Sequence, residues 1–185
     1  MFLQRYYKHI IIEITNKFFS NFILSALAAP SLQFFGSKIG KNVRIYTPLI
    51  LHNTKFKNLT IGNNCHIGRD VFFDLYNEVF IEDHVTISMR CMLITHIDVG
   101  DSPLKKYGYR NCSGKITIHN GVYIGAGTII LHGVEIGHDS LVGAGTLVNK
   151  DIPPYSLVVG VPGRIVKRLD HKSTLPIGEP TQGEG

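Results

Sequence analysis

The sequence lacks several features that would assign it to other classes of protein. It contains no tryptophan, and its three cysteines, Cys65, Cys91 and Cys112, form no CxxC pair and leave an odd number. We therefore expect no disulfide framework and a reduced, cytoplasmic compartment. The net charge of +5 comes from basic residues that are scattered along the chain, so no nucleic-acid interface is expected. The length of 185 residues suits one domain.

A long uninterrupted apolar run is also missing. Residues 1–36 are apolar and non-repetitive, but Glu13 and Lys17 interrupt them, which argues against a signal peptide. A spanning helix is disfavoured because the apolar part is diluted by Ser20, Asn21, Ser25 and Pro30. Apolar residues at helical spacing predict an N-terminal helical segment ended by Pro30. We expect this segment to pack on the rest of the chain or along a subunit boundary. The alternative is a peripheral contact with the inner face of a membrane.

In place of these features the sequence has a period of six. Between residues 118 and 150 an aliphatic residue opens every hexad, and a small or β-branched residue takes the fifth position. The opening residues are Ile118, Ile124, Ile130, Ile136, Val142 and Val148. This period fits neither a helix nor an ordinary strand, and it predicts a chain that turns a corner every six residues and stacks coil on coil. Cys65 and Cys91 take fifth positions, so we expect them to fill the core.

Hexads extend from Ile39 to Ile152, which predicts a solenoid over residues 37–155 of roughly five or six coils. They blur between Pro48 and Asn58, shift in phase after Phe73, and stop in the insertion 99–115. Insertions at corners lie on the surface, and one this long is usually functional or disordered. Residues 156–169 are predicted to form a C-terminal segment. Residues 170–185 are expected to be a disordered tail.

Several motifs accompany the hexads. Thr95-His96 directly precedes the insertion, GAG occurs at 125–127 and 143–145, and NKDIPP at 149–154 is followed by GVPGR at 160–164. With these motifs the chain resembles the hexapeptide-repeat acyltransferases, most closely the sugar and polysaccharide O-acetyltransferases. The resemblance implies an all-β, left-handed parallel β-helix that assembles as a homotrimer, and a short basic helix within the C-terminal segment 156–169. It also implies that acetyl-CoA is the cosubstrate and that a sugar or polysaccharide precursor is the acceptor. The acetyl group would be transferred to a hydroxyl of the acceptor or, less readily, to an amine.

The resemblance places the catalytic histidine at His96. A thioester is already activated, so the enzyme needs mainly a base that takes the acceptor proton during direct attack, and an imidazole suits that task near neutral pH. The resemblance implies an acceptor-binding role for Asp74, where the family often has asparagine. We expect Asp98, Arg90 and Tyr76 to face the same cleft. Alternatively, Asp98 orients the ring of His96.

Coenzyme A carries several phosphate charges at one end and a narrow pantetheine arm at the other. Cations near the C-terminal motifs can pair with the phosphates, and small residues of the GAG repeats leave room for the arm. The resemblance therefore implies a set of cofactor-binding residues. These are Tyr123, Ala126, Ala144, Asn149, Lys150, Arg164 and Arg168.

Two other classes of function stay open at this point. The same β-helix carries a metal site in γ-class carbonic anhydrases, and His132 with His138 suggests such a site, although no third histidine clearly joins them. The acyltransferase hypothesis itself expects no metal. The other alternative is a non-catalytic solenoid, which would not need the basic C-terminal motif.

Overall fold

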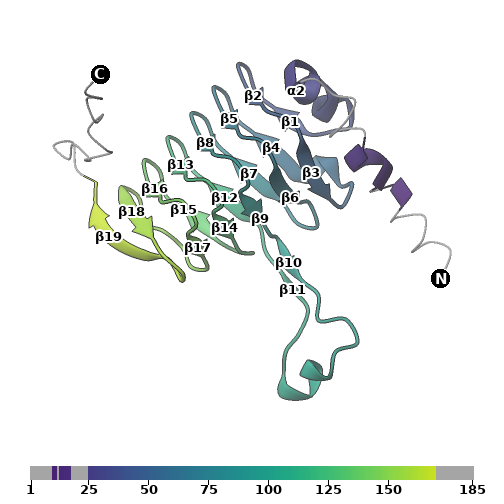
Figure 1. The fold of residues 1–185 in the computed structure, drawn as a ribbon, viewed down its shortest axis with the longest axis vertical. Coiled ribbons are helices and arrows are strands. Elements are labelled where there is room, and N and C mark those ends of the chain that lie inside the picture. Colours follow the sequence, from purple (N-terminus) through teal and green to yellow (C-terminus); the bar gives the residue numbers. More distant parts are fainter. Residues whose placement is uncertain (1–9, 12, 18–24, 170–185) are drawn as a thin grey trace, which may run out of the picture.

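The computed structural model describes residues 10–11, 13–17 and 25–169. The expected parallel β-helix is confirmed: short strands stack coil on coil into a prism with three flat faces (Figure 1). We call the faces A, B and C in the order in which the chain visits them in each coil. The edges between them are A–B, B–C and C–A, and at edge C–A the chain passes from one coil to the next.

Five complete coils and part of a sixth form the prism. Face A consists of β1 (Lys38–Ile39), β4 (Leu59–Ile61), β7 (Val79–Ile81), β12 (Ile116–Ile118) and β15 (Glu135–Ile136). Face B consists of β2 (Arg44–Ile45), β5 (His66–Ile67), β8 (Thr86–Ile87), β13 (Tyr123–Ile124), β16 (Leu141–Val142) and β18 (Ser156–Val159). Face C consists of β3 (Leu49–His52), β6 (Val71–Asp74), β9 (Met92–Leu93), β14 (Ile129–Ile130) and β17 (Leu147–Val148).

The opening aliphatics of the hexads form three columns, one behind each face. On face A, for example, the parallel register aligns Ile39, Ile61, Ile81, Ile118 and Ile136. All six opening residues predicted between residues 118 and 150 are buried, and so are Cys65 and Cys91. Stacked burial of this kind explains why the period is six, since each coil must return one aliphatic residue to each column.

The close stacking of coils also explains the GAG motifs at edge B–C. A Cβ atom on Gly125 would lie 2.5 Å from the backbone nitrogen of Ala144 in the next coil. Because that neighbour is backbone, no side-chain rotation relieves the clash, so glycine is required for close approach. The two GAG motifs therefore lie directly over one another.

Every interruption of the hexads falls at edge C–A. Along the other two edges the buried aliphatics stay six residues apart, as in Ile39, Ile45 and Leu51. From face C to the next face A the spacing is ten from Leu51 to Ile61, eight from Phe73 to Ile81 and 25 from Leu93 to Ile118. It returns to six from Ile130 to Ile136. Three consecutive coils therefore carry extra residues at one edge, which is where loops lie without disturbing the columns.

The largest of these interruptions projects from the prism as a hairpin (Figure 1). Its base is the antiparallel pair β10 (His96–Ile97) and β11 (Cys112–Ser113), and a 3₁₀ turn, η3 (Pro103–Tyr107), lies near its tip. The smaller interruption after β3 contains the 3₁₀ turn η2 (Phe56–Asn58). The predicted insertion 99–115 is thus an ordered hairpin that begins three residues earlier, at His96.

The N-terminal helical segment is confirmed where the structure describes it. Residues 10–11 and 13–17 are helical, and α2 (Ser25–Phe34) packs Ala28 and Leu32 against the first coil. The prediction that Pro30 ends the helix is wrong, because Pro30 lies inside α2. Proline removes one backbone donor, but later bonds such as that from the Phe35 N–H to the Ser31 carbonyl still form.

Among the described helices, none has the length and apolar character needed to cross a bilayer. Residues 1–9, 12 and 18–24 of the segment on which a membrane contact would depend lie outside the described part of the chain, as does the predicted disordered tail 170–185.

The short C-terminal helix predicted within 156–169 is wrong. The chain instead turns back and forms β19 (Arg164–Arg168), antiparallel to β18. The last strand of a stack presents unpaired backbone groups, and a returning strand satisfies them. Ile165 and Val166 are β-branched and favour that strand, whereas the helix was expected from the resemblance to the family's C-terminal motif.

His119 joins three coils at edge A–B. Its Nδ1 lies 3.1 Å from Glu82 Oε1 in the preceding coil, and its Nε2 lies 2.6 Å from Glu135 Oε1 in the following one. The hydrogen bond to Glu135, and then that to Glu82, raise the pKa of His119 above its ordinary 6.5 although partial burial acts the other way. The protonated ring therefore bonds the coils more strongly than the neutral ring.

We predict a pH-dependent stability from this bridge. The pKa of His119 is higher in the folded chain than in the unfolded chain, so its protonation stabilises the fold. This stabilisation is fully present below pH 6.5, and it is lost as the pH rises through the pKa of the folded state. The melting temperature of the wild type should therefore fall, relative to that of His119→Gln, as the pH rises above 6.5 and through the raised pKa. A constant difference between the two proteins over this range would contradict the bridge.

Candidate active site

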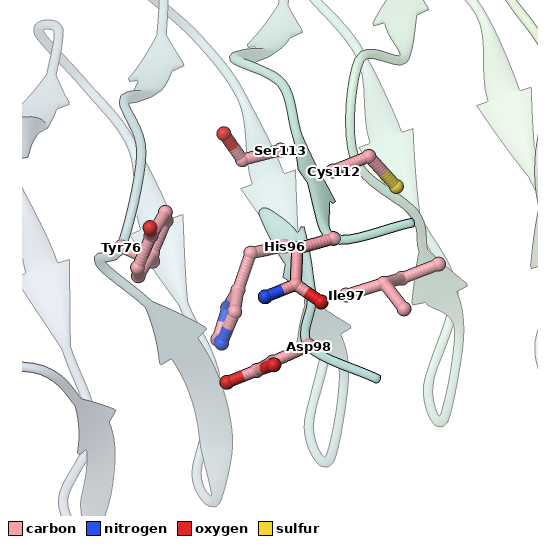
Figure 2. A pocket seen from close by; sticks show the side chains of 7 residues that line it. Tyr76, His96, Ile97, Asp98, Cys112 and Ser113 are labelled. Carbon is pink, nitrogen blue, oxygen red and sulfur yellow. The ribbon is translucent and has the colours of Figure 1, made fainter. Parts of the chain in front are cut away.

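The three interruptions at edge C–A meet around His96. The second corner and the base of the hairpin form a pocket of about 150 Å³, lined by Tyr76, His96, Ile97, Asp98, Asn111, Cys112 and Ser113. Figure 2 shows the His96 ring hanging from β10 on the side of Tyr76, whereas the sulfur of Cys112 points away. Cys112 Sγ contacts His132 Nε2 in the next coil at 3.4 Å.

Asp74 lies beneath His96 at the end of β6, in register with His52 of β3. It is 1% exposed, and its Oδ2 lies 2.5 Å from Nδ1 of His96. The same oxygen accepts hydrogen bonds from the Thr95 N–H, the Thr95 hydroxyl and the His96 N–H. The other oxygen accepts from Asn53 Nδ2 and the Tyr76 N–H. The carboxylate is therefore buried and fully engaged.

These hydrogen bonds keep Asp74 ionised. Burial alone would raise the pKa of its carboxyl, but the hydrogen bonds from His96, the Tyr76 N–H and Thr95 outweigh burial and hold the pKa below its ordinary 3.8. A fixed negative charge at Nδ1 favours the tautomer that carries its proton there. The other ring nitrogen, Nε2, is then left with an unshared pair that can accept a proton.

Two aromatic rings stack on the imidazole of His96. Tyr76 lies 4.4 Å away between ring centroids with an interplanar angle of 16°, and His52 lies 5.7 Å away at 7°. Lys55 Nζ stands 4.5 Å from the centroid of the Tyr76 ring. The side chain of His96 is 20% exposed. The ring is thus partly covered yet open to the pocket, an arrangement suited to proton transfer.

The predicted acceptor-binding residues occupy different places. Asp98 lines the pocket, but its Oδ1 accepts the Gly100 N–H at 2.8 Å, and it is Asp74 that contacts His96 Nδ1. Asp74 lies under the histidine instead of facing the cleft. Arg90 lies at edge B–C beside Asp70, at 4.0 Å, and does not line the pocket.

The predicted cofactor-binding residues fall into two groups. Asn149, Lys150 and Arg164 line one groove of about 430 Å³ near the C-terminal end of edge C–A. Ala126 and Ala144 stack at edge B–C, and Tyr123 is half-exposed on face B. Arg168 pairs with Ser156 across β18 and β19, outside that groove.

Sequence reasoning missed His52, Lys55 and Asn53 in the surroundings of His96. The signal that could have located them is the break in the hexads between Pro48 and Asn58. Breaks at the same edge in consecutive coils lie next to one another, so the residues that cause them gather in one place.

The two histidines considered for a metal site lie apart. His132 contacts Cys112 at edge C–A, whereas His138 contacts Asp139 and Tyr155 at edge A–B. Within the described part of the chain, the group with donor atoms close enough for a shared ion is His52, Asp74 and His96. The oxygens of Asp74 are already occupied by the hydrogen bonds described above, which leaves this carboxylate little capacity to bind an ion.

Comparison with known proteins agrees with this fold. Residues 115–150 match the family model described as bacterial transferase hexapeptide (six repeats). The chain belongs to the hexapeptide-repeat acyltransferases, and its fold is their left-handed β-helix.

Individual relatives carry sugar-related names. The galactoside O-acetyltransferase of Escherichia coli (strain K12) is 32% identical over 141 residues, which cover 72% of this chain and 64% of that protein. The chain therefore spans somewhat less than two thirds of that relative's length.

Two solved structures are also similar. One is a galactoside acetyltransferase in complex with coenzyme A, with a TM-score of 0.75 and 26% identity over 88% of this chain and 81% of that chain. The other is AntD, an N-acyltransferase from Bacillus cereus in complex with dTDP and 3-hydroxybutyryl-CoA. Its TM-score is 0.61, with 31% identity over 72% of this chain and 73% of that chain.

We predict that neutral His96 carries its proton on Nδ1. Nitrogen-15 chemical shifts of the ring, measured above the pH at which it is protonated, should show a protonated Nδ1 and an unprotonated Nε2. In Asp74→Asn the amide can donate to Nδ1, so the population should move toward the opposite tautomer. Equal tautomer populations in the wild type and the variant would contradict the role of Asp74.

Proposed function

We propose that the protein transfers an acetyl group from acetyl-CoA to a hydroxyl of a sugar or polysaccharide precursor, with His96 as general base. The observation that carries this proposal is the buried, ionised Asp74 held against Nδ1 of His96, with Nε2 left open toward a pocket. The names of the relatives, galactoside O-acetyltransferases among them, support the substrate class.

The reaction needs one proton relay and no covalent enzyme intermediate. The acceptor hydroxyl gives its proton to His96 Nε2 while its oxygen attacks the thioester carbonyl. When the tetrahedral intermediate collapses, the C–S bond breaks and the imidazolium returns the proton to the sulfur of coenzyme A. The negative charge of Asp74 stabilises the imidazolium that exists between these two events.

Acetyl-CoA is expected to bind along two parts of the surface. Lys150 and Arg164 in the C-terminal groove supply cations for its phosphates, with Asn149 beside them and Arg168 further along β19. The stacked Ala126 and Ala144 leave room for the pantetheine arm, next to the exposed ring of Tyr123. The coenzyme A complex of a related acetyltransferase supports this choice of cosubstrate.

The acceptor atom is a hydroxyl or, as the second possibility, an amine. A base at neutral pH serves both, and one related structure is an N-acyltransferase. Thiol release from acetyl-CoA in the presence of sugars, nucleotide sugars and polysaccharide repeat units tests the proposal. Mass spectrometry of the product then distinguishes an ester from an amide.

We predict a homotrimer. His96 lies at edge C–A, whereas Ala126 and Ala144 lie at edge B–C of the same chain. A thioester bound along edge B–C of one chain is closest to the His96 of a second chain if edge C–A of that second chain lies beside it. Arg90 of the first chain would then face the acceptor across the subunit interface. Light scattering should give three times the chain mass of 20.6 kDa. A monomer at assay concentration would count against this arrangement.

We predict that His96→Ala lowers kcat by about two to four powers of ten, the usual contribution of a positioned base. The KM for acetyl-CoA and the melting temperature should change little, because the ring projects from the hairpin base and not into the core. His132→Ala, one coil further along the same edge, is the matched control and should keep most of the activity. A His96→Ala protein that retains its rate would refute the assignment.

We also predict that Lys150→Ala combined with Arg164→Ala raises the KM for acetyl-CoA. The cause is the loss of two charges that face phosphate groups, so a cosubstrate that lacks the 3′-phosphate should be affected much less. Steady-state kinetics with acetyl-CoA and acetyl-dephospho-CoA measure the difference. Equal losses with both cosubstrates would contradict the phosphate-binding role.

A further inference from the structure

Tyr76 owes its place to the smallest interruption of the hexads. Phe73 and Ile81 are eight residues apart, so the corner between β6 and β7 is two residues longer than a regular corner. The longer corner places Tyr76 beside the pocket, on the side toward which the His96 ring hangs (Figure 2).

The backbone of Tyr76 is held from three directions. Its N–H donates to Asp74 Oδ1 at 3.1 Å, and its carbonyl accepts from Lys55 Nζ at 3.2 Å and from Asn58 Nδ2 at 3.3 Å. Lys55 and Asn58 belong to the longer corner of the preceding coil. The ring of Tyr76 is thus carried on a fixed support although it is 45% exposed.

Asp74 alone does not define the orientation of the histidine. Its hydrogen bond fixes the position of Nδ1, but the ring plane can still tilt about that contact, and a tilt moves Nε2. The Tyr76 ring lies almost parallel to the imidazole at 4.4 Å and limits this tilt from one face. A flat aromatic face also attracts a cation, so it stabilises the imidazolium.

We propose that Tyr76 is a positioning residue that holds the plane of the His96 ring, so that Nε2 faces the acceptor, and stabilises the imidazolium formed during transfer. The catalytic part of this inference rests on the proposed function. Other charged or titratable groups around the ring are Asp74 at Nδ1, His52 stacked on it, Lys55 beyond Tyr76, and Asp98 and Cys112 in the pocket.

The test compares Tyr76→Phe, which keeps the ring, with Tyr76→Met, which fills similar volume without an aromatic face. Tyr76→Phe should keep a kcat much closer to that of the wild type than Tyr76→Met does. Tyr76→Met should lower kcat roughly 3- to 30-fold with little change in the KM for acetyl-CoA. In the His96→Ala background the two variants should be equally active, because no imidazole is left to position.

Equal kcat values for Tyr76→Phe and Tyr76→Met, or a loss that persists without His96, would overturn the inference. A readout independent of activity is the chemical shift of the His96 ring protons. The stacked Tyr76 ring should move them upfield in the wild type and in Tyr76→Phe but not in Tyr76→Met. Nuclear Overhauser contacts between the two rings should be present in the wild type. Their absence would refute the stack even if the proposed reaction holds, whereas contacts in a protein that transfers no acetyl group would refute only the proposed function.

Discussion

The constraint on which the structure depends is the alignment of aliphatic side chains in three columns. Each coil must place one such residue behind each face, and the parallel backbone bonds between coils keep the columns in register. A change at a column position disturbs the coils above and below it. Differences in length and sequence between coils are therefore confined to the edges. Active-site residues differ from coil to coil, so they are found at the edges too.

Edge C–A shows how this constraint builds a site. The first three coils each add residues at that edge, and each addition contributes one layer: His52 and Lys55, then Asp74 and Tyr76, then His96 with its hairpin. The fourth coil has no extra residues at edge C–A. His132 lies at that edge in the fourth coil and contacts Cys112 of the hairpin. The buried charge of Asp74 is tolerated because six hydrogen-bond donors surround it.

Much of the fold could be predicted because the period of six is a direct consequence of stacking. The six opening aliphatic residues from Ile118 to Val148 are buried in the core, as the period of six predicts, and so are Cys65 and Cys91. The C-terminal strand and the continuation of α2 past Pro30 could not be predicted. The strand depends on unpaired backbone groups of β18, and the helix depends on its packing against the first coil. For the site, the sequence indicated His96, but the function of Asp74 depends on burial and on contacts from Thr95 and Tyr76. The contact from Thr95 joins residues some 20 positions apart, and it appears only when coils are stacked.

The most direct test of the central claim is a structure of the protein bound to coenzyme A and a sugar acceptor. The account predicts an acceptor hydroxyl within roughly 2.6–3.2 Å of His96 Nε2, with the sulfur of coenzyme A near enough to receive the proton from the same nitrogen. An acceptor bound instead in the groove between His119 and His138, or a hydroxyl that meets no atom of His96, would contradict it.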